Sequence, residues 1–359
     1  MDRYIGLDAH SSSCTVAVIG PSGKRLQTQV LETNAKALID FIRAIPGTRH
    51  LCLEEGTHSN WLYEVLSPHV QEIVVAGVRQ ERGPKSDTID AFGLAGKLRI
   101  GAVERRVYKE HGAFGALREL CQAHNVLVAD SIRVQNRIKS LFRSRGIPCS
   151  TRQVYSTGRR EKWIEKLPAR SQPLAETLYL EYDALEQLRE RAEKAMIEEA
   201  RKHAMYRILK TVPGIGDIRA AQVLPIVVTP YRFSNKRSFW SYCGLAIVMR
   251  SSSDWVRTQD GSWARAMTQQ TRGLNRNYNR VLKYIFKGAA TTAIARCKDG
   301  PLYRHYQMLL DGGTKPNLAR LTIARQVASI VLSIWRSEEV YDPKRVSHTT
   351  ERFSELEVV

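Results

Sequence analysis

The segment YIGLDAHSSSCTVAVIGPSGKRLQTQVL, residues 4–31, decides the fold of the N-terminal part of this chain. It contains three strand-like runs, and the second and third are joined by Pro-Ser-Gly-Lys, which is typical of a hairpin turn. Three strands that follow one another with short connections predict an antiparallel meander. The segment therefore predicts a sheet that begins with two hairpins.

Helices and strands alternate after this meander. Residues 33–45 have apolar side chains at helical spacing behind a cap at Thr33 or Asn34. The remaining predicted elements are a strand at 50–55, a helix at 59–66, a strand at 72–77 and a helix at 87–99. A three-strand meander followed by alternating parallel strands is the plan of the ribonuclease H superfamily. The predicted fold class of residues 1–109 is therefore α/β of the ribonuclease H type.

Charge is distributed unevenly along this chain of 359 residues, whose net charge is +19. Residues 1–100 contain eleven basic and eleven acidic residues. In contrast, residues 131–160 contain eight Lys or Arg and no acid, and residues 201–290 contain sixteen Lys or Arg against three acids. Such a local surplus of positive charge is typical of a surface that binds nucleic acid. We therefore expect a nucleic-acid partner.

Other features argue against several classes of protein. No stretch approaches about 18 consecutive apolar residues, and the N-terminus lacks the pattern of a signal peptide, so we expect a cytoplasmic protein with no membrane partner. The six cysteines form no CxxC pair, and the nine histidines form no HxH or HxxxH pair. A zinc ribbon, a disulfide framework and histidine-based metal binding are therefore not predicted.

Four acidic residues stand where a ribonuclease H topology brings them together. Asp8 ends the first strand, Glu55 ends the fourth, and Asp87 and Asp90 lie on one face at the start of a helix. Singly, each acid has a structural explanation, such as helix capping by Asp87. As a set they predict a site for Mg²⁺ or Mn²⁺, because carboxylates are preferred ligands of these ions. Two such ions can bind the attacking and leaving oxygens of a phosphodiester.

The middle of the chain is predicted to be mostly helical. Residues 110–165 are predicted to form a basic helical extension and linker. Residues 166–203 are predicted to form a helical connector in which apolar residues recur at every third or fourth position. This repeat is typical either of a short coiled coil or of one amphipathic helix packed on its own domain. The coiled-coil alternative predicts a homo-oligomer, either a dimer or a tetramer.

Residues 204–337 are predicted to form a second, mainly helical domain, with a tail at 338–359. VPGIGDIRAA, residues 212–221, has the glycine spacing of a helix-hairpin-helix turn, in which Gly214 and Gly216 let backbone N–H groups meet a phosphate. Further candidates for nucleic-acid binding are Lys236, Arg237, Arg272, Arg276 and Arg280. The last three of these are spaced four residues apart, which predicts a basic stripe on one face of a helix.

Together these motifs resemble a known family. GLDAH, LEEGTHSNWLYEVL and KSDTIDA look like the RuvC-like DEDD domain of a group of insertion-sequence transposases, which are described as bridge-RNA-guided recombinases and are related to pilin-gene inverting recombinases. VPGIG, YCGLA, the serines at 251–253 and RGLNR resemble the second domain of the same group. The resemblance covers nearly the whole chain, with both sets of motifs in order.

The resemblance implies roles for single residues. Asp8, Asp87 and Asp90 match the first, third and fourth acids of the DEDD motif. Glu55 matches the second acid through the threonine and tryptophan that follow it, and Glu54 remains an alternative.

A catalytic serine is also implied at a fixed distance after the Gly-Leu pair of YCGLA. That register falls on Ser252, and Ser251 and Ser253 remain alternatives because the residue that follows Ser252 is not the usual glycine.

The function that the resemblance implies is recombination of an insertion sequence. Ser252 attacks a phosphodiester beside the metal site to give a covalent phosphoserine, and a guide RNA selects the DNA target. One alternative is a RuvC-like nuclease or junction resolvase that uses the acids alone, and another is a non-catalytic nucleic-acid-binding protein. A sugar kinase of the actin-like fold shares the meander but needs a second glycine-rich phosphate loop, which the sequence lacks.

Overall fold

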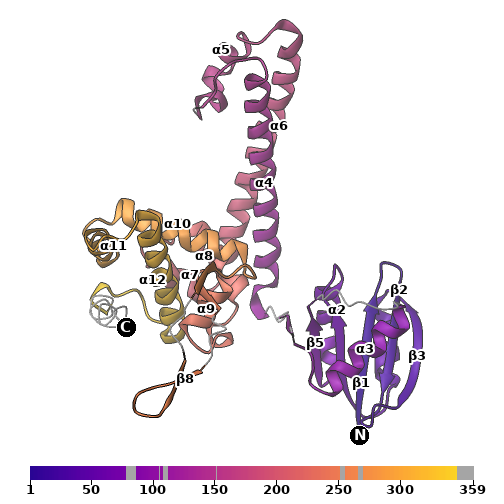
Figure 1. The fold of residues 1–359 in the computed structure, drawn as a ribbon. Coiled ribbons are helices and arrows are strands. Elements are labelled where there is room, and N and C mark those ends of the chain that lie inside the picture. Colours follow the sequence, from indigo (N-terminus) through magenta and orange to yellow (C-terminus); the bar gives the residue numbers. More distant parts are fainter. Residues whose placement is uncertain are drawn as a thin grey trace. The chain divides into compact units, whose positions relative to one another are not determined.

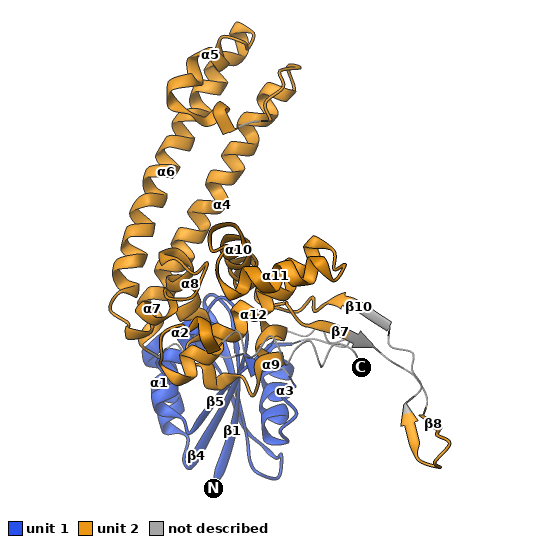
Figure 2. Ribbon diagram, turned by 90° about the vertical axis from the view of Figure 1, so that its left-hand side faces the viewer, with its two compact units in different colours: residues 1–110 blue, residues 111–359 orange. Residues whose placement is uncertain are grey.

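The structure, a computed structural model, divides into two compact units, Met1–Glu110 and His111–Val359 (Figure 2). It describes residues 1–77, 86–104, 106–107, 112–150, 152–250, 255–265 and 270–345. Each unit has its own hydrophobic core, so each is described by itself.

Unit 1 is a six-stranded sheet covered by helices, with the strand order β3-β2-β1-β4-β5-β6 (Figure 1). The first three strands form the antiparallel meander, and β4 and β5 run parallel to β1. Every element predicted for this unit is confirmed in its predicted order, and the described residues also contain a 3₁₀ turn at Ser67–His69 and a short antiparallel edge strand, β6, that were not predicted. The elements are β1 (Asp2–Ala9), β2 (Ser13–Ile19), β3 (Arg25–Glu32), α1 (Ala35–Ala44), β4 (Thr48–Glu54), α2 (Ser59–Leu66), β5 (Glu72–Ala76), α3 (Asp87–Arg99) and β6 (Arg106–Val107).

The two faces of β1 pack against different helices. Ile5 and Leu7 are fully buried with Leu38 of α1 and Leu62 of α2. Gly6 points to the opposite face, where a Cβ atom would lie only 1.8 Å from the carbonyl oxygen of Ala91 in α3. Because residue 6 has no side chain, α3 lies directly on the backbone of β1.

Unit 2 begins with two long antiparallel helices, α4 (Gly115–Arg143) and α6 (Gln172–Ala200), which lie side by side as an arm (Figures 1 and 2). A small core at the end of the arm includes Phe142, whose ring meets that of Trp163 in α5 (Arg160–Ile164) edge to face. At the other end, Leu117 and Met196 enter the main core of the unit.

The main core of unit 2 is formed by helices. They are α7 (Ala204–Leu209), α8 (Asp217–Val227), α9 (Lys236–Tyr242), α10 (Arg280–Arg296), α11 (Pro301–Asp311) and α12 (Pro316–Ser337). The predicted helical connector and the predicted C-terminal domain therefore share one core. Two antiparallel strand pairs that the sequence did not predict also occur: β7 (Ile247–Arg250) with β10 (Gln270–Leu274), and β8 (Trp255–Arg257) with β9 (Trp263–Arg265).

Helix α12 is long and apolar enough to cross a membrane, judged by length and composition alone. More than half of its most apolar window is buried, and Ile323, Val327 and Val331 belong to the core of unit 2. Burial of this kind is typical of the central helix of a soluble protein.

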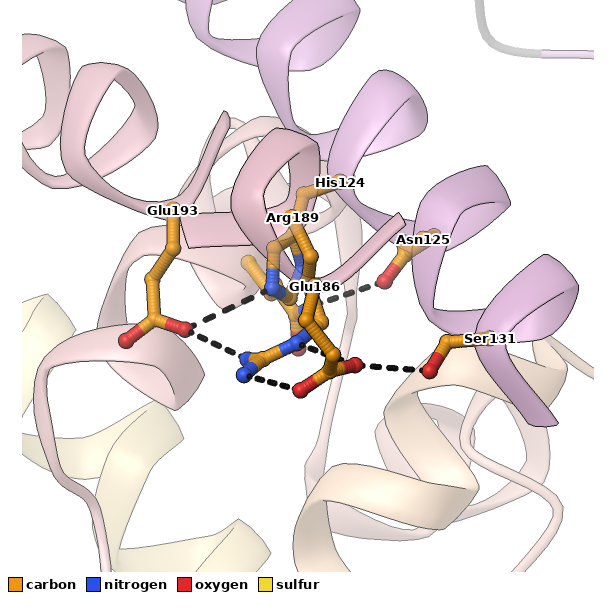
Figure 3. Close-up of polar contacts among 7 residues, drawn as sticks. His124, Asn125, Ser131, Glu186, Arg189 and Glu193 are labelled. Carbon is orange, nitrogen blue, oxygen red and sulfur yellow. Dashed lines mark hydrogen bonds and ion pairs between the residues drawn. The ribbon is translucent and has the colours of Figure 1, made fainter. Parts of the chain in front are cut away.

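Polar side chains connect α4 and α6 near the base of the arm (Figure 3). Ser131 of α4 donates to Glu186 of α6 (2.7 Å), and Glu186 and Glu193 both pair with Arg189. His124 of α4 is 4% exposed, and its Nε2 lies 3.8 Å from a Glu193 carboxylate oxygen. Neither ring nitrogen of His124 has a hydrogen bond within the described part of the chain.

Burial lowers the pKa of His124, and we expect this to make the arm sensitive to acid. The folded state disfavours the charged imidazole. The free energy of unfolding is therefore highest above the pKa of histidine in the unfolded chain, about 6.5, and decreases as the pH drops below it. We predict that His124→Leu is more stable than the wild type by about 1 kcal/mol at pH 5.5, with a smaller difference at pH 7.5. Thermal unfolding at the two pH values measures this, and an equal difference at both would contradict it.

Candidate functional site

The carboxyl end of β1 carries the candidate metal site. One ligand atom from each of Asp8, His10 and Asp87 lies within 4.8 Å of the other two. His10 Nε2 is 3.5 Å from Asp8 Oδ2 and 3.4 Å from Asp87 Oδ1, so the imidazole lies between the two carboxylates. The fold thus joins two of the four predicted acids, one from a strand and one from a helix.

The start of α3 sets the position of the acid pair. Ser86, in extended conformation, caps the helix, and its Oγ accepts a hydrogen bond from the Ile89 N–H (3.3 Å). Asp87 is therefore the first residue of the helix and not its cap, so the capping explanation for Asp87 is wrong. Asp90 follows within the first turn, and both acids are exposed.

The acids influence one another electrostatically. Burial raises the pKa of Asp8 most strongly, His10 opposes this rise, and the carboxylates of Asp87 and Asp90 raise the pKa further. The side chain of Asp8 is 17% exposed, so water screens this repulsion only in part. A divalent cation at this position would relieve the repulsion among the three carboxylates.

His10 belongs to the candidate site, although the sequence motifs did not indicate it. It forms no pair with another histidine, and its partner in sequence is an aspartate two positions earlier. Alternate residues of a strand point to the same face, so Asp-x-His at the end of a strand is a signal that could have found it. Its backbone is fixed on both sides: the N–H donates to Ser13 O (2.9 Å), and the carbonyl accepts from Thr33 Oγ1 (2.9 Å).

The donor set fits a divalent cation. Asp8 and Asp87 offer the oxygen ligands that Mg²⁺ and Mn²⁺ prefer. The imidazole of His10 adds a nitrogen donor, which favours a transition metal such as Mn²⁺ over Mg²⁺. These residues would hold the ion between the end of β1 and the first turn of α3.

The two glutamates considered for the second acid, Glu54 and Glu55, lie at the end of the neighbouring strand β4. In the parallel pairing of β1 with β4, Leu7 lies beside Leu53, so the next position brings Asp8 beside Glu54. Glu55 follows the end of β4, and its N–H donates to Ala76 O (2.8 Å). The register thus favours Glu54, the alternative that the sequence left open, and Glu55 stays a prediction.

The faces of the two strands also favour Glu54. Cys52 packs against Leu98 of α3, and Gly6 approaches α3 from β1. Since residues two apart share a face, Glu54 and Asp8 both belong on the α3 side, where Asp87 and Asp90 begin the helix. Neither glutamate is without a partner.

This register gives a direct comparison of two adjacent residues. We predict that Glu54→Gln lowers metal-dependent DNA cleavage by at least about a hundredfold, since it removes a charge from the ligand set. Glu55→Gln is expected to change the cleavage rate by less than about threefold, because a substitution at a residue that does not bind the metal ion has only a small effect. Cleavage rates of the two variants under identical conditions test this, and the opposite pattern would return the role to Glu55.

In unit 2, the quoted motifs YCGLA and RGLNR contact each other. A Cβ atom at Gly244, whose φ is +67°, would lie 2.4 Å from the ring of Tyr278. Asn275 donates from Nδ2 to Ser241 Oγ (3.0 Å) and from its backbone N–H to Ala246 O (3.1 Å). These contacts fix the start of β7, which leads to the serines.

The predicted nucleophile Ser252 and its alternatives Ser251 and Ser253 lie outside the described residues. Strand β7 ends at Arg250 and β8 begins at Trp255, so the described strands flank the serines on both sides.

The two glycines of the predicted helix-hairpin-helix turn have different roles. Gly214 has a φ of +84°, and a Cβ atom there would lie 2.2 Å from Ala289 O in α10, so this glycine permits close packing of the turn. Gly216 is exposed at the start of α8, and a Cβ atom there would have no neighbour within 4 Å among the described atoms. Gly214 is therefore needed for the packing of the turn, and phosphate binding by the backbone of either glycine stays a prediction.

The basic stripe predicted on one helix face is wrong. Arg272 belongs to strand β10, Arg276 follows that strand, and Arg280 is the first residue of α10. Arg276 and Arg280 are nevertheless exposed. Lys236 and Arg237 are exposed in the first turn of α9, where burial and the charge of Arg237 lower the pKa of Lys236.

Comparison with known proteins agrees with this arrangement. Residues 5–145 match the family model of the IS110 DEDD domain, described as "Transposase", and residues 206–307 match "Transposase IS116/IS110/IS902 family". The insertion element IS116 uncharacterized 44.8 kDa protein of Streptomyces clavuligerus is 23% identical over 399 residues, which cover 95% of this chain and 96% of that protein.

These similarities define the class of the protein as a two-domain transposase. Both domains of the IS110/IS116 transposase family are present in this chain and in the order that the sequence motifs predicted. The resemblance to an insertion-sequence transposase is thereby confirmed. Such a transposase acts on DNA, and its DEDD domain indicates the use of a divalent metal.

Proposed function

We propose that this protein moves an insertion sequence by cutting and rejoining DNA through a covalent phosphoserine. The observation that carries the proposal is the cluster of Asp8, His10 and Asp87 in a chain with both transposase domains. A mere fold relative would not need to keep two carboxylates and an imidazole so close to one another.

In the proposed reaction, unit 1 holds the scissile phosphate. A bound divalent cation would stabilise charge on the phosphate oxygens. Asp8 and Asp87 would supply oxygen ligands, and His10 Nε2, which lies within 3.5 Å of both carboxylates, would supply a nitrogen ligand. Asp90 and one of Glu54 and Glu55 complete the set of acids.

Ser252 supplies the nucleophile. Its Oγ forms a bond to phosphorus while the bond from phosphorus to the departing strand-end oxygen breaks. The hydroxyl proton passes to a base, and the departing oxygen takes a proton. Attack by another strand end reverses these steps and releases the serine, so that joining needs no nucleotide cofactor.

Guide RNA and self-association extend the proposal. Selection of the target by a base-paired RNA requires protein surfaces that read shape and backbone, which basic side chains such as Arg276 and Arg280 provide. Helix α6 exposes Leu174, Leu180 and Leu188, which a second copy of the chain would cover in a dimer or tetramer.

The experiment that tests this function combines the purified protein, Mn²⁺ or Mg²⁺, labelled DNA of the element ends and the RNA encoded beside them. A labelled protein–DNA adduct on a denaturing gel is the expected result. Cleavage without any adduct would favour the hydrolytic nuclease instead. Binding without cleavage under all conditions would favour a non-catalytic nucleic-acid-binding protein.

A further inference from the structure

Residues 255–265 form a small two-stranded hairpin, named here the tryptophan ribbon. In β8 and β9, Trp255 pairs with Arg265 and Arg257 pairs with Trp263. Residues two apart in a strand, and residues directly opposite across a pair, lie on the same face. Trp255, Arg257 and Trp263 therefore share one face of the ribbon.

This face is exposed. The side chains of Trp255 and Trp263 are 57% and 64% exposed, and Arg257 is exposed as well. Figure 2 shows β8 standing away from the helices of unit 2. A single exposed apolar residue needs no explanation, but two tryptophans on one face of a ribbon are typical of a binding surface.

The tip of the ribbon is held by its own polar groups. Thr258 N–H donates to Ser262 O (2.8 Å), and Gly261, with a φ of +84°, donates to Thr258 O (3.0 Å). Asp260 accepts from Ser262 Oγ (2.9 Å). Arg257 Nε donates to Gly261 O (3.3 Å), which ties the guanidinium to the turn. The face is thus preorganised, which lowers the entropic cost of binding.

The charge around the ribbon indicates the kind of partner. Residues 247–276 contain five arginines and two aspartates, in a domain whose class acts on DNA. Aromatic rings combined with arginines bind single-stranded nucleic acid, since every base has a flat face on which a ring can stack. A duplex hides those faces, and a protein partner would not require the positive charge.

We propose that the tryptophan ribbon binds unpaired nucleotides, with Trp255 and Trp263 stacking on bases and Arg257 contacting the phosphate backbone. The inference rests on the proposed function in one respect, namely that the protein handles DNA strands that must separate before they are exchanged.

The test measures binding of the full-length protein in EDTA, where strand chemistry does not contribute. The probes are a fluorescent dT20 strand, a 20-base-pair duplex and a dT20 strand whose central bases are replaced by abasic sites. Trp263→Ala is compared with Trp263→Phe, which keeps a ring, and with Tyr231→Ala, which removes a ring that is 74% exposed elsewhere in unit 2. Thermal unfolding verifies that each variant is folded.

We expect Trp263→Ala to weaken dT20 binding about tenfold and duplex binding less than twofold. Trp263→Phe should retain most of the affinity, and wild type and Trp263→Ala should bind the abasic strand equally. Arg257→Gln should weaken binding to both single strands, because both contain phosphates.

Unchanged dT20 affinity in Trp263→Ala, or an equal loss in Tyr231→Ala, would overturn the ribbon proposal while leaving the proposed function intact. A wild-type protein that binds none of the probes would also overturn the ribbon proposal, and the adduct assay with element-end DNA decides the proposed function separately.

Discussion

Asp8→Asn is expected to lower metal-dependent DNA cleavage by about three orders of magnitude while DNA binding in EDTA stays unchanged. Asp8 is the least exposed acid of the cluster, and its side chain contacts His10. The charges of Asp87 and Asp90 act on it electrostatically, in addition to its burial. An amide in its place keeps the shape but removes the charge that holds a cation, and metal stabilisation of a phosphoryl transfer is worth several kcal/mol. A cleavage assay with Mg²⁺ and with Mn²⁺ measures the loss.

Stability separates this loss from misfolding. The raised pKa of Asp8 means that its ionised form destabilises the folded protein. This loss of stability is largest above the pKa of Asp8 in the folded protein and disappears as the pH falls through that pKa. Metal-free Asp8→Asn should therefore unfold at the same temperature as the wild type at pH 7, or slightly higher. Added Mn²⁺ should stabilise only the wild type. Asp40→Asn, an exposed acid of α1, is the control, and wild-type cleavage by Asp8→Asn would exclude the proposed metal site.

Ser252→Ala is expected to abolish the covalent protein–DNA adduct completely. Alanine has no oxygen to bond to phosphorus, so no residual adduct can form at this position. Denaturing gels with labelled element-end DNA measure the adduct, and mass spectrometry of the digested adduct identifies the modified serine. Ser251→Ala and Ser253→Ala are matched controls from the same segment, and both should retain the adduct.

The serine variants also distinguish among the alternatives. If the adduct survives in Ser252→Ala and disappears in Ser251→Ala or Ser253→Ala, the nucleophile is the neighbour. If cleavage continues at the wild-type rate in all three variants, the acids act alone as a hydrolytic nuclease. In each case Asp8→Asn should remain inactive, because both the serine reaction and hydrolysis require the metal site.

Most of unit 1 could be predicted from the sequence because its signals are local. Apolar runs of strand length, the turn at 20–24 and the cap at Asn34 each depend on a few adjacent residues, and the structure confirms them. The pairing of β6 with β5 could not be predicted, since two residues carry no pattern of their own. His10 was missed because a search for pairs of histidines does not detect a histidine beside an aspartate.

Unit 2 was harder to predict because a spacing of four does not define a helix. Arg272, Arg276 and Arg280 fall at helical intervals, yet Gly273 has a φ of +78°, which a helix does not permit, and α10 begins only at Arg280. The strands β7 to β10 are short, and β7 pairs with β10 across the β8–β9 hairpin that lies between them in sequence. The role of Gly214 likewise depends on α10, about 75 residues later in the chain.

The close contact between Gly6 and α3 has a consequence for how this metal site is maintained. The distance from Asp8 to Asp87 depends on how near the helix lies to the strand, and that depends on a position with no side chain. A methyl group at residue 6 would push the helix away from the strand and separate the ligands without touching any of them. The geometry of the ligands is therefore encoded partly in a residue that never meets the ion, and a search for catalytic positions based on charged side chains alone would overlook it.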